Sequence, residues 1–321
     1  MINKIFGTGG IGIGIFFKFH SDRPLTRDES RLAYLTDYKD YCKAHIILHY
    51  VAALANGADV YAIGMVGNDE NGSLLLNMMS AAGIDTRFVK TTDEAGTAYS
   101  VCFQYPDGAG GNITASNSAC GLVTPEYIES CARGGPGVDS DSLVLAAPEV
   151  PLASRIRLLE IGRERGAFTA ASFLSGEARD FLDAGGFELS DLVSVNGDEA
   201  RAAAGLGEEY SGASLAEAYA GAIAARSPKT RLIVTVGAGG SYVCENGGIT
   251  HIPCIPETIA STAGAGDAYL GGVIAGLAGG MSLIGSAKYG AVLARFAVRS
   301  ENTIAEDVTL ANLEKYFRDN G

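Results

Sequence analysis

Apolar runs and helix-like patterns alternate along most of the chain. Runs typical of buried strands lie at 60–66, 143–147, 168–173, 191–195 and 231–236. Apolar residues at helical spacing predict helices over 72–82, 151–165 and 213–227. Short strands that alternate with helices favour a parallel sheet covered on both faces. The pattern therefore predicts an α/β protein with a mostly parallel central sheet.

Two segments break this alternation. Residues 12–22 and 96–106 alternate as an extended chain does and are rich in aromatic residues, so each predicts strands of a small separate sheet. Between them, residues 36–57 predict one long helix that stops at Gly57. We expect a single domain over residues 1–321, with the strands of the small sheet inserted at about 12–35 and 88–117. An exposed apolar face on that sheet is a candidate surface for a homodimer.

The composition narrows the class of protein. With 321 residues, of which 47% are hydrophobic, the chain can bury a large core. A net charge of −13, with only 24 Lys and Arg residues, argues against sequence-independent binding to nucleic acid. The chain contains neither an apolar run of the roughly 18 residues that a membrane helix needs nor a signal-peptide pattern. The six cysteines form no C-x-x-C pair, which favours reduced thiols in a cytoplasmic protein over a zinc site.

The first apolar run, residues 2–6, leads into a glycine-rich segment. Residues 7–12 fit the pattern G-x-G-x-x-G, which opens a helix in dinucleotide-binding proteins. Here Ile13, Gly14 and an aromatic run follow, and these residues favour a strand over a helix. The glycines fit a close approach of backbone or ligand better than they fit a dinucleotide site.

A second glycine-rich segment, residues 261–272, carries the candidate chemistry. Its small residues lead into a helical stripe that starts after Asp267, so this carboxylate lies in the first helical turn. Unpaired N–H groups and the positive end of the helix dipole make such a turn an anion site. A carboxylate beside a phosphate site suits a base that takes a proton from an attacking hydroxyl. The alternative is a tight turn in which Asp267 only stabilises the helix.

This segment resembles the G-A-G-D signature of the PfkB-type carbohydrate kinases, the ribokinase family. Three further motifs agree with the family in order and spacing: 66–72 resembles V-G-x-D-x-x-G, 196–199 resembles N-x-x-E and 235–240 resembles T-x-G-x-x-G. The resemblance covers about residues 57–300. It implies a ribokinase-like three-layer α/β/α fold with a small β lid. It also implies phosphorylation of a hydroxyl of a sugar or sugar-like molecule, with ATP and Mg²⁺.

The resemblance further implies roles for residues of the G-A-G-D segment. Asp267 would be the base that deprotonates the acceptor hydroxyl. The transferring phosphoryl group would be held by the amides of Gly264, Ala265 and Gly266. Such an arrangement suits a negatively charged transition state, which needs positioning and charge neutralisation more than covalent chemistry.

The other motifs would form the nucleotide and metal side of the site. The resemblance implies that Asn196 and Glu199 organise Mg²⁺ and phosphates, with Glu199 as the metal-binding carboxylate. It implies that the nucleotide is contacted by Thr235, Gly237 and Gly240. Taken alone, the pair of Asn196 and Glu199 also fits an ordinary helix cap.

The acceptor half of the family pattern is missing. Gly12 stands where the family has a substrate-binding aspartate, Lys43 and Ala44 where it has a glycine pair, and Leu48 where it has a sugar-binding asparagine. Either a different acceptor is held by other side chains, with added room beside Gly12, or the chain is a catalytically weak binding protein. Ser261 replaces an aspartate that is frequent in the family, which leaves the use of a monovalent cation open.

Other polar residues are candidates for the acceptor site. His45 and His49 share one face of the expected helix, and Asn112 lies near the second lid segment. The histidines fit core or lid packing equally well. A zinc site on this pair lacks an obvious third ligand.

Overall fold

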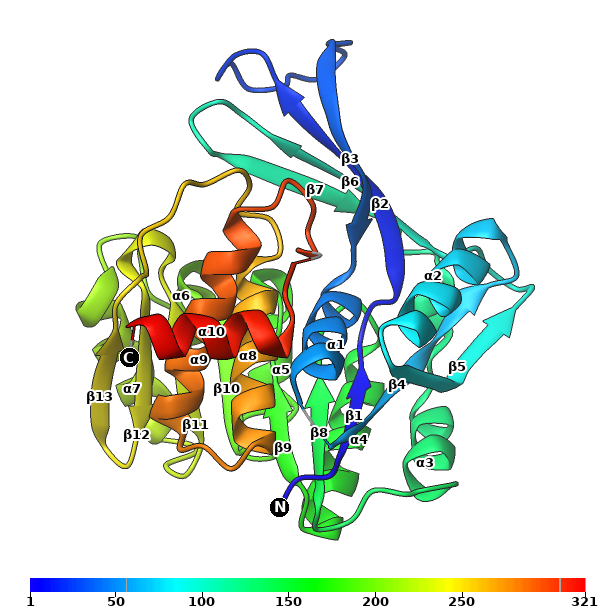
Figure 1. Cartoon of the computed structure of the whole chain (residues 1–321), viewed down its shortest axis with the longest axis vertical. Helices are drawn as coiled ribbons and strands as arrows, with labels where there is room; N and C mark the ends of the chain where they lie inside the picture. The colour runs from blue at the N-terminus through cyan, green and yellow to red at the C-terminus, as the bar shows by residue number, and fades with distance from the viewer. Residues whose placement is uncertain (56, 306, 321) are drawn as a thin grey trace.

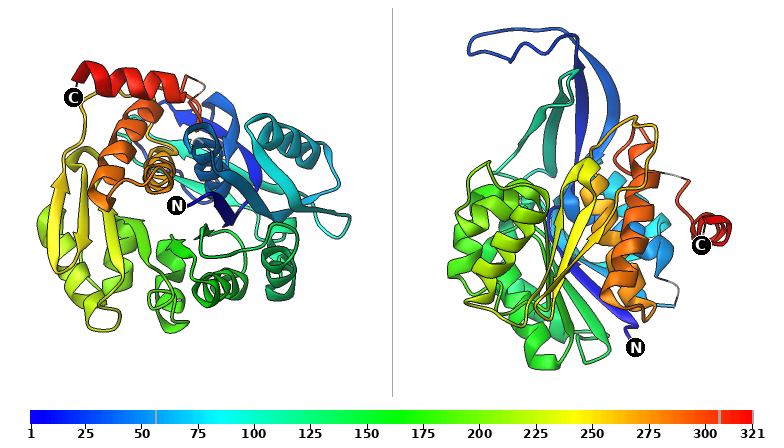
Figure 2. Two further views of the ribbon diagram at one scale, coloured as in Figure 1. Left: turned by 60° about the horizontal axis from the view of Figure 1, so that its bottom comes forward. Right: turned by 90° about the vertical axis from the view of Figure 1, so that its left-hand side faces the viewer.

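The computed structural model describes residues 1–55, 57–305 and 307–320, with residues 37–39 and 320 described by their backbone only. Over these residues the chain forms a central sheet between two layers of helices (Figure 1; Figure 2). A smaller sheet projects from this body. The three-layer α/β/α arrangement expected from the sequence is therefore confirmed.

The central sheet has nine strands in the described part of the chain, in the order β13-β12-β11-β10-β9-β8-β1-β4-β5. From β11 to β5 all neighbours are parallel, and β12 and β13 add an antiparallel hairpin at one edge. The strands are β1 (Lys4–Thr8), β4 (Asp59–Gly67), β5 (Ile84–Thr92), β8 (Ser142–Ala146), β9 (Phe168–Ala171), β10 (Leu192–Asn196), β11 (Arg231–Thr235), β12 (Ser241–Glu245) and β13 (Gly248–Ile252).

Two sets of helices cover the sheet, one on each face (Figure 2). The first set is α1 (Lys43–Leu54), α2 (Glu70–Ala81), α8 (Ala265–Ala278), α9 (Leu283–Val298) and α10 (Leu310–Asn320). The second set is α3 (Pro125–Arg133), α4 (Leu152–Arg165), α5 (Ala178–Asp183), α6 (Gly197–Ala204) and α7 (Gly212–Ala224). None of the described helices combines the length and the apolar character that crossing a membrane requires.

Consecutive side chains of the central strands enter the two cores in turn. In β1, Ile5 packs into the core formed with the first set of helices, and Phe6 packs into the core formed with the second. Leu143 and Val144 of β8 divide in the same way. Strands that are buried on both faces appear in a sequence as unbroken apolar runs, which is why 143–147 predicts this strand well.

The smaller sheet, which we call the lid, has the order β3-β2-β6-β7. Its strands are β2 (Gly12–Phe19), β3 (Ala33–Tyr41), β6 (Ala98–Gln104) and β7 (Gly110–Thr114). Strands β2 and β6 are parallel, whereas β3 and β7 pair with them in antiparallel fashion. The aromatic alternation of the two segments therefore predicted strands correctly.

The helix expected over 36–57 is wrong in its first part. Residues 36–41 belong to β3, and α1 begins only at Lys43. The reason is a contact between distant segments: the buried Asp40 accepts hydrogen bonds from Ser100 Oγ (3.1 Å) and Cys102 Sγ (2.8 Å) of β6. Helix α1 ends at Leu54, and residue 56, near the expected end of the helix, lies outside the described residues.

Candidate active site

The sequence motifs meet at the carboxyl ends of the central parallel strands. Asn196, at the end of β10, pairs in register with Thr235, at the end of β11. Just beyond β1, the Gly10 N–H donates to the carbonyl of Pro148, which follows β8 (2.9 Å). Ligands of open α/β sheets bind at this edge. The lid lies over the same edge, because β2 continues from the end of β1 (Figure 1).

Gly264 turns the chain into α8. It is the N-cap residue of the helix and has a φ of +74°, a left-handed conformation that favours glycine. A Cβ here would lie 2.7 Å from the Thr303 carbonyl oxygen. At Gly266, in the first turn, a Cβ would meet nothing within 4 Å. The turn is thus open beside N–H groups that have no partner within the helix, which is the arrangement of an anion site.

Asp267 lies in the same turn and pairs with Lys43, the first residue of α1. The Asp267 carboxylate and the Lys43 ammonium are 3.7 Å apart. Burial raises the pKa of Asp267, and the positive charge of Lys43 opposes this shift. The pKa of Lys43 is raised in turn, chiefly by the charge of Asp267. A partly desolvated carboxylate beside a single cation is suited to accept a proton.

Asn196 and Glu199 form the helix cap that the sequence left open as an alternative. Asn196 Oδ1 accepts a hydrogen bond from the Glu199 N–H (2.9 Å), and Glu199 Oε2 accepts one from the Asn196 N–H (2.8 Å). This capping box starts α6. Glu199 is buried, and burial raises its pKa. Among the described residues, the cap engages only one of the two carboxylate oxygens.

The T-x-G-x-x-G segment forms a tight bend after β11. Gly237 and Gly240 have φ values of +57° and +85°, and a short 3₁₀ helix lies between β11 and β12. A Cβ at Gly240 would overlap the carbonyl oxygen of Ile252 in β13. Glycine at this position therefore lets the bend pack closely on the sheet edge. The bend begins at Thr235, next to Asn196, so the two motifs adjoin in space.

Glu149 is a site residue that the sequence reasoning missed. It follows β8 with a φ of +75°, which is strained for a residue with a side chain. Its Oε2 accepts a hydrogen bond from the backbone N–H of Lys43 (3.2 Å), and its carboxylate fills the space where a Cβ at Gly10 would lie. Burial raises its pKa, and Lys43 opposes the shift. The sequence did contain a signal for this residue, because a carboxylate within Pro148–Val150 directly follows the apolar run of a buried strand.

The space beside Gly12 is already filled. A Cβ at this position would lie 2.7 Å from both Cys42 Sγ and the Ala98 carbonyl oxygen. The expectation that Gly12 makes room for a larger acceptor is therefore wrong, because lid and helix atoms close the gap. The element after the glycines is strand β2, as the sequence predicted, and not the helix that a dinucleotide site requires.

The other three acceptor candidates lie in different environments. His45 is fully buried against the ring of Tyr41, and neither ring nitrogen has a hydrogen-bond partner among the described residues. A substrate in the open site cannot reach it, so we remove His45 from the acceptor candidates. His49 is half-buried beside it, and no described cluster of three or more His, Cys, Asp or Glu side chains could hold a metal ion. Asn112 is exposed on β7, with its amide 3.4 Å from Thr114 Oγ1.

One lid side chain contacts the body close to the G-A-G-D segment. Lys18 Nζ, on β2, donates a hydrogen bond to the Ala260 carbonyl (3.1 Å). Ala260 directly precedes Ser261, so the lid touches the segment that leads into α8. The lid thus contacts the segment before the first turn of α8, although the two lie at opposite ends of the sequence.

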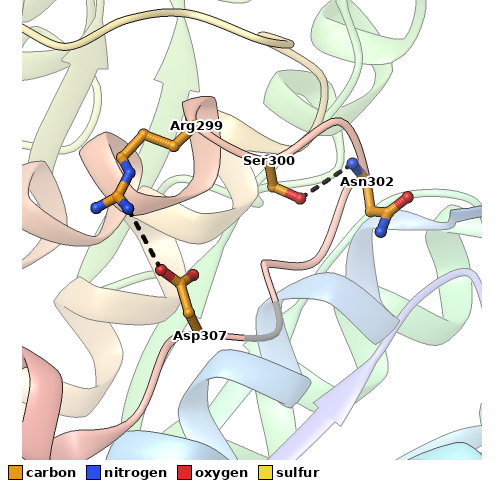
Figure 3. Close-up of a pocket in the computed structure, with 4 residues that line it drawn as sticks. All are labelled: Arg299, Ser300, Asn302 and Asp307. Carbon is orange, nitrogen blue, oxygen red and sulfur yellow. Dashed lines mark hydrogen bonds and ion pairs between the residues drawn. The ribbon is translucent and has the colours of Figure 1, made fainter.

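A cavity of about 310 Å³ lies at the end of α9 (Figure 3). It is lined by Arg299, Ser300, Asn302 and Asp307. The Arg299 guanidinium and the Asp307 carboxylate are 3.7 Å apart. The lining thus holds one positive and one negative side chain, whose charges offset each other. Ser261 is itself buried, and its hydroxyl accepts a hydrogen bond from the Ala263 N–H (3.2 Å).

Comparison with known proteins identifies the family. The family model described as pfkB family carbohydrate kinase matches residues 49–309. The chain belongs to this family. The members of the family are phosphotransferases that act on alcohol groups of carbohydrates, so the chain is assigned to the same class of enzyme.

Two relatives in the family are 26–28% identical to this chain over about two thirds of its length. The bifunctional ribokinase/ribose-5-phosphate isomerase A of Fructilactobacillus sanfranciscensis is 28% identical over 69% of this chain and 39% of its own length. The fructokinase of Klebsiella pneumoniae is 26% identical over 69% of this chain and 72% of its own length. The match thus spans well under half of the bifunctional relative.

Solved structures of the family confirm the ribokinase-like fold. The ribokinase of Cryptococcus neoformans var. grubii serotype A, in complex with ADP, has a TM-score of 0.79 at 21% identity, covering 98% of this chain and 99% of that one. The ribokinase of Giardia lamblia has a TM-score of 0.84 at 16% identity, with the same coverage of 98% and 99%. At these identities the likeness establishes the fold and not the substrate.

Proposed function

We propose that this protein transfers the γ-phosphoryl group of ATP to a hydroxyl of a sugar or sugar-like molecule, with Asp267 as the base. The observation that carries this proposal is the position of the Asp267 carboxylate in the open first turn of α8. There it lies beside N–H groups that have no partner within the helix and 3.7 Å from an ammonium. A base and an anion site in one helical turn are what phosphoryl transfer to a hydroxyl requires.

We assign each group of residues a separate role in the reaction. Asp267 accepts the proton of the attacking hydroxyl. The amides of Gly264, Ala265 and Gly266 donate to the transferring phosphoryl oxygens, whose negative charge they stabilise. The bend from Thr235 through Gly237 to Gly240 contacts the nucleotide. This half of the proposal follows the family resemblance.

A magnesium ion fits the carboxylate of Glu199. Mg²⁺ is held in kinases by one or two carboxylates together with substrate phosphates and water, so a dedicated cage of acidic residues is not needed. The helix cap leaves one Glu199 oxygen for a further partner, and Asn196 lies beside it. When bound, Mg²⁺ neutralises the charge that develops on the nucleotide phosphates.

The acceptor is held by residues that differ from the usual ones of the family. We assign Glu149 to the acceptor hydroxyls, because its strained backbone directs the carboxylate into the space beside Gly10. Asn112 of the lid is a second candidate. Gly12 contributes close packing of the lid strand rather than a contact with the acceptor.

The direct test is a screen of neutral sugars, polyols and nucleosides for acceptor-dependent release of ADP from ATP and Mg²⁺. The matched control is Asp267→Asn, which removes the base without changing the size of the side chain. We expect kcat of this variant on the true acceptor to fall by at least about 10²-fold, with nucleotide affinity retained. Turnover within a few-fold of wild type would remove Asp267 from the role of base.

The alternative is a catalytically weak nucleotide- or metabolite-binding protein on the same fold. The missing family residues at positions 12, 43 and 48 favour it. Thermal-shift measurements with ATP, ADP, NAD and Mg²⁺ separate the two functions. Stabilisation by ATP without turnover on any acceptor would support the binding protein, and a response to NAD alone would contradict both.

We also propose a homodimer formed through the lid. The support is that apolar side chains on and next to the lid strands are exposed: Leu32 is 85% exposed, Ile113 is 70% exposed and Tyr34 is 63% exposed. Light scattering after size exclusion tests it, since Ile113→Glu should convert a dimer to a monomer.

For location we propose the cytoplasm, in agreement with six cysteines that are all free thiols.

A further inference from the structure

Lys43 lies between the acceptor side and the phosphate side of the candidate site. Its backbone N–H donates to Glu149 Oε2 (3.2 Å), on the acceptor side. Its ammonium lies 3.7 Å from the Asp267 carboxylate, at the start of α8. The charges of Glu149 and Glu199 add to the negative surroundings of the ammonium. A single residue therefore connects both halves of the site.

The ammonium is held by charge and not by a directional bond. Its separation of 3.7 Å from Asp267 exceeds the roughly 2.7–3.2 Å of an N–H···O hydrogen bond. Among the described residues Lys43 Nζ makes no hydrogen bond within 3.5 Å and no other ion pair, and the side chain keeps 31% of its surface exposed. An ammonium on a flexible four-carbon stem can re-aim its donors at low cost.

We propose that Lys43 transfers its ammonium from Asp267 to the transferring phosphoryl group during catalysis. This inference rests on the proposed kinase function. In that reaction the acceptor oxygen bonds to the γ-phosphorus, the bond to the leaving ADP oxygen breaks with its electron pair, and the acceptor proton moves to Asp267. The neutral Asp267 then no longer attracts the ammonium, while the phosphoryl oxygens do.

The pairing also sets the strength of the base before the reaction. A cation close to a carboxylate favours its charged form, so Lys43 keeps Asp267 ready to accept a proton. The other titratable groups within electrostatic reach of Asp267 are Glu149, Glu199 and Tyr50. None of these three is cationic, and removal of Lys43 would leave Asp267 among groups that disfavour its charge.

The test compares Lys43→Met with Lys43→Arg, and uses Lys288→Met as the control. Lys288 is an exposed lysine on α9, so its loss removes a positive charge without touching the site. The first readout is the pH profile of kcat/KM on the true acceptor. The second is the affinity for ADP with aluminium fluoride and acceptor, a transition-state mimic, set against the affinity for ADP alone.

For Lys43→Met we expect kcat to fall about 10²-fold, in the range of a lost electrostatic stabiliser. The acid limb of the pH profile should move to higher pH, and affinity for the mimic should fall at least tenfold with ADP affinity unchanged. Lys43→Arg should recover part of both effects because it retains the charge, and Lys288→Met should match wild type.

An unchanged pH profile and unchanged affinity for the mimic in Lys43→Met would overturn the inference and leave Lys43 as a structural ion pair. If Lys43→Met does not fold, Lys43→Gln carries the same two readouts. A wild type that neither turns over any acceptor nor binds ADP would instead defeat the proposed function itself.

Discussion

Replacing the buried His45 by leucine should make the protein less sensitive to acid. His45 has 0% exposure and no hydrogen-bond partner for either ring nitrogen among the described residues. Burial, with a smaller contribution from His49, lowers its pKa from 6.5 to about 3. Below pH 6.5 the unfolded chain therefore binds a proton at His45, whereas the folded chain binds it only near pH 3. Stability from this residue is present above pH 6.5 and is lost as the pH falls toward 3.

The magnitude follows from the two pKa values. Between pH 7 and pH 5 the unfolded chain gains most of one proton at this residue, which costs roughly 2 kcal/mol of folding free energy. His45→Leu removes that cost. It also removes two unpaired buried nitrogens, so the variant should be more stable than wild type even at pH 7.

The assay is urea unfolding of wild type, His45→Leu and the exposed control His20→Leu at pH 7 and pH 5. The other titratable groups are the same in wild type and His45→Leu, so the informative quantity is the difference between the changes in their free energy of unfolding from pH 7 to pH 5. Wild type and His20→Leu should each lose roughly 2 kcal/mol more than His45→Leu. Equal losses in all three would refute the reasoning and would mean that His45 is solvated or hydrogen-bonded.

Four further substitutions test the site. Gly264→Ala should lower the melting temperature, because the +74° φ costs about 1–2 kcal/mol for alanine and the new Cβ meets a backbone carbonyl. Gly266→Ala should leave the melting temperature unchanged or raise it, but it should lower kcat because the new methyl group blocks the open turn. Full activity in Gly266→Ala would place the phosphoryl group elsewhere. Glu199→Gln should raise the Mg²⁺ concentration for half-maximal activity, as measured by magnesium titration at saturating ATP, and an unchanged titration would leave Glu199 as a helix cap only. Gly12→Asp should destabilise the fold in thermal melts, because Cys42 and a lid carbonyl fill the space, and a stable variant with altered KM for the acceptor would restore Gly12 to the acceptor site.

The central sheet could be predicted from the sequence because each of its buried strands forms a mostly apolar run. The run at 143–147 is apolar without interruption, since its two faces enter two different cores. Strand β3 could not be predicted in this way. Its residues are polar and aromatic in a pattern that also suits a helix start, and its state is decided by pairing with β2 and by the bonds from β6 to Asp40.

The local structure around Asp267 could be predicted from the sequence, whereas the contact between Glu149 and Lys43 could not. Asp267 lies in a motif whose loop and helix are adjacent in sequence, so local pattern is enough to place it. Glu149 and Lys43 are far apart in sequence and meet only in the folded chain. The shared helical face of His45 and His49 was a correct spacing argument, but spacing alone does not tell whether that face meets solvent or core.

The central place of β1 has a consequence for how the chain is made. Strand β1 precedes the other described strands, and it pairs on one side with β4 and on the other with β8, which begins only at Ser142. At synthesis rates of about 5–20 residues per second, the apolar N-terminal strand waits on the order of ten seconds for its second partner. During that time its backbone edge can join other nascent chains. Truncated messages that end before Ser142 should therefore yield aggregating fragments, while a chain arrested after β8 can already close the middle of its sheet.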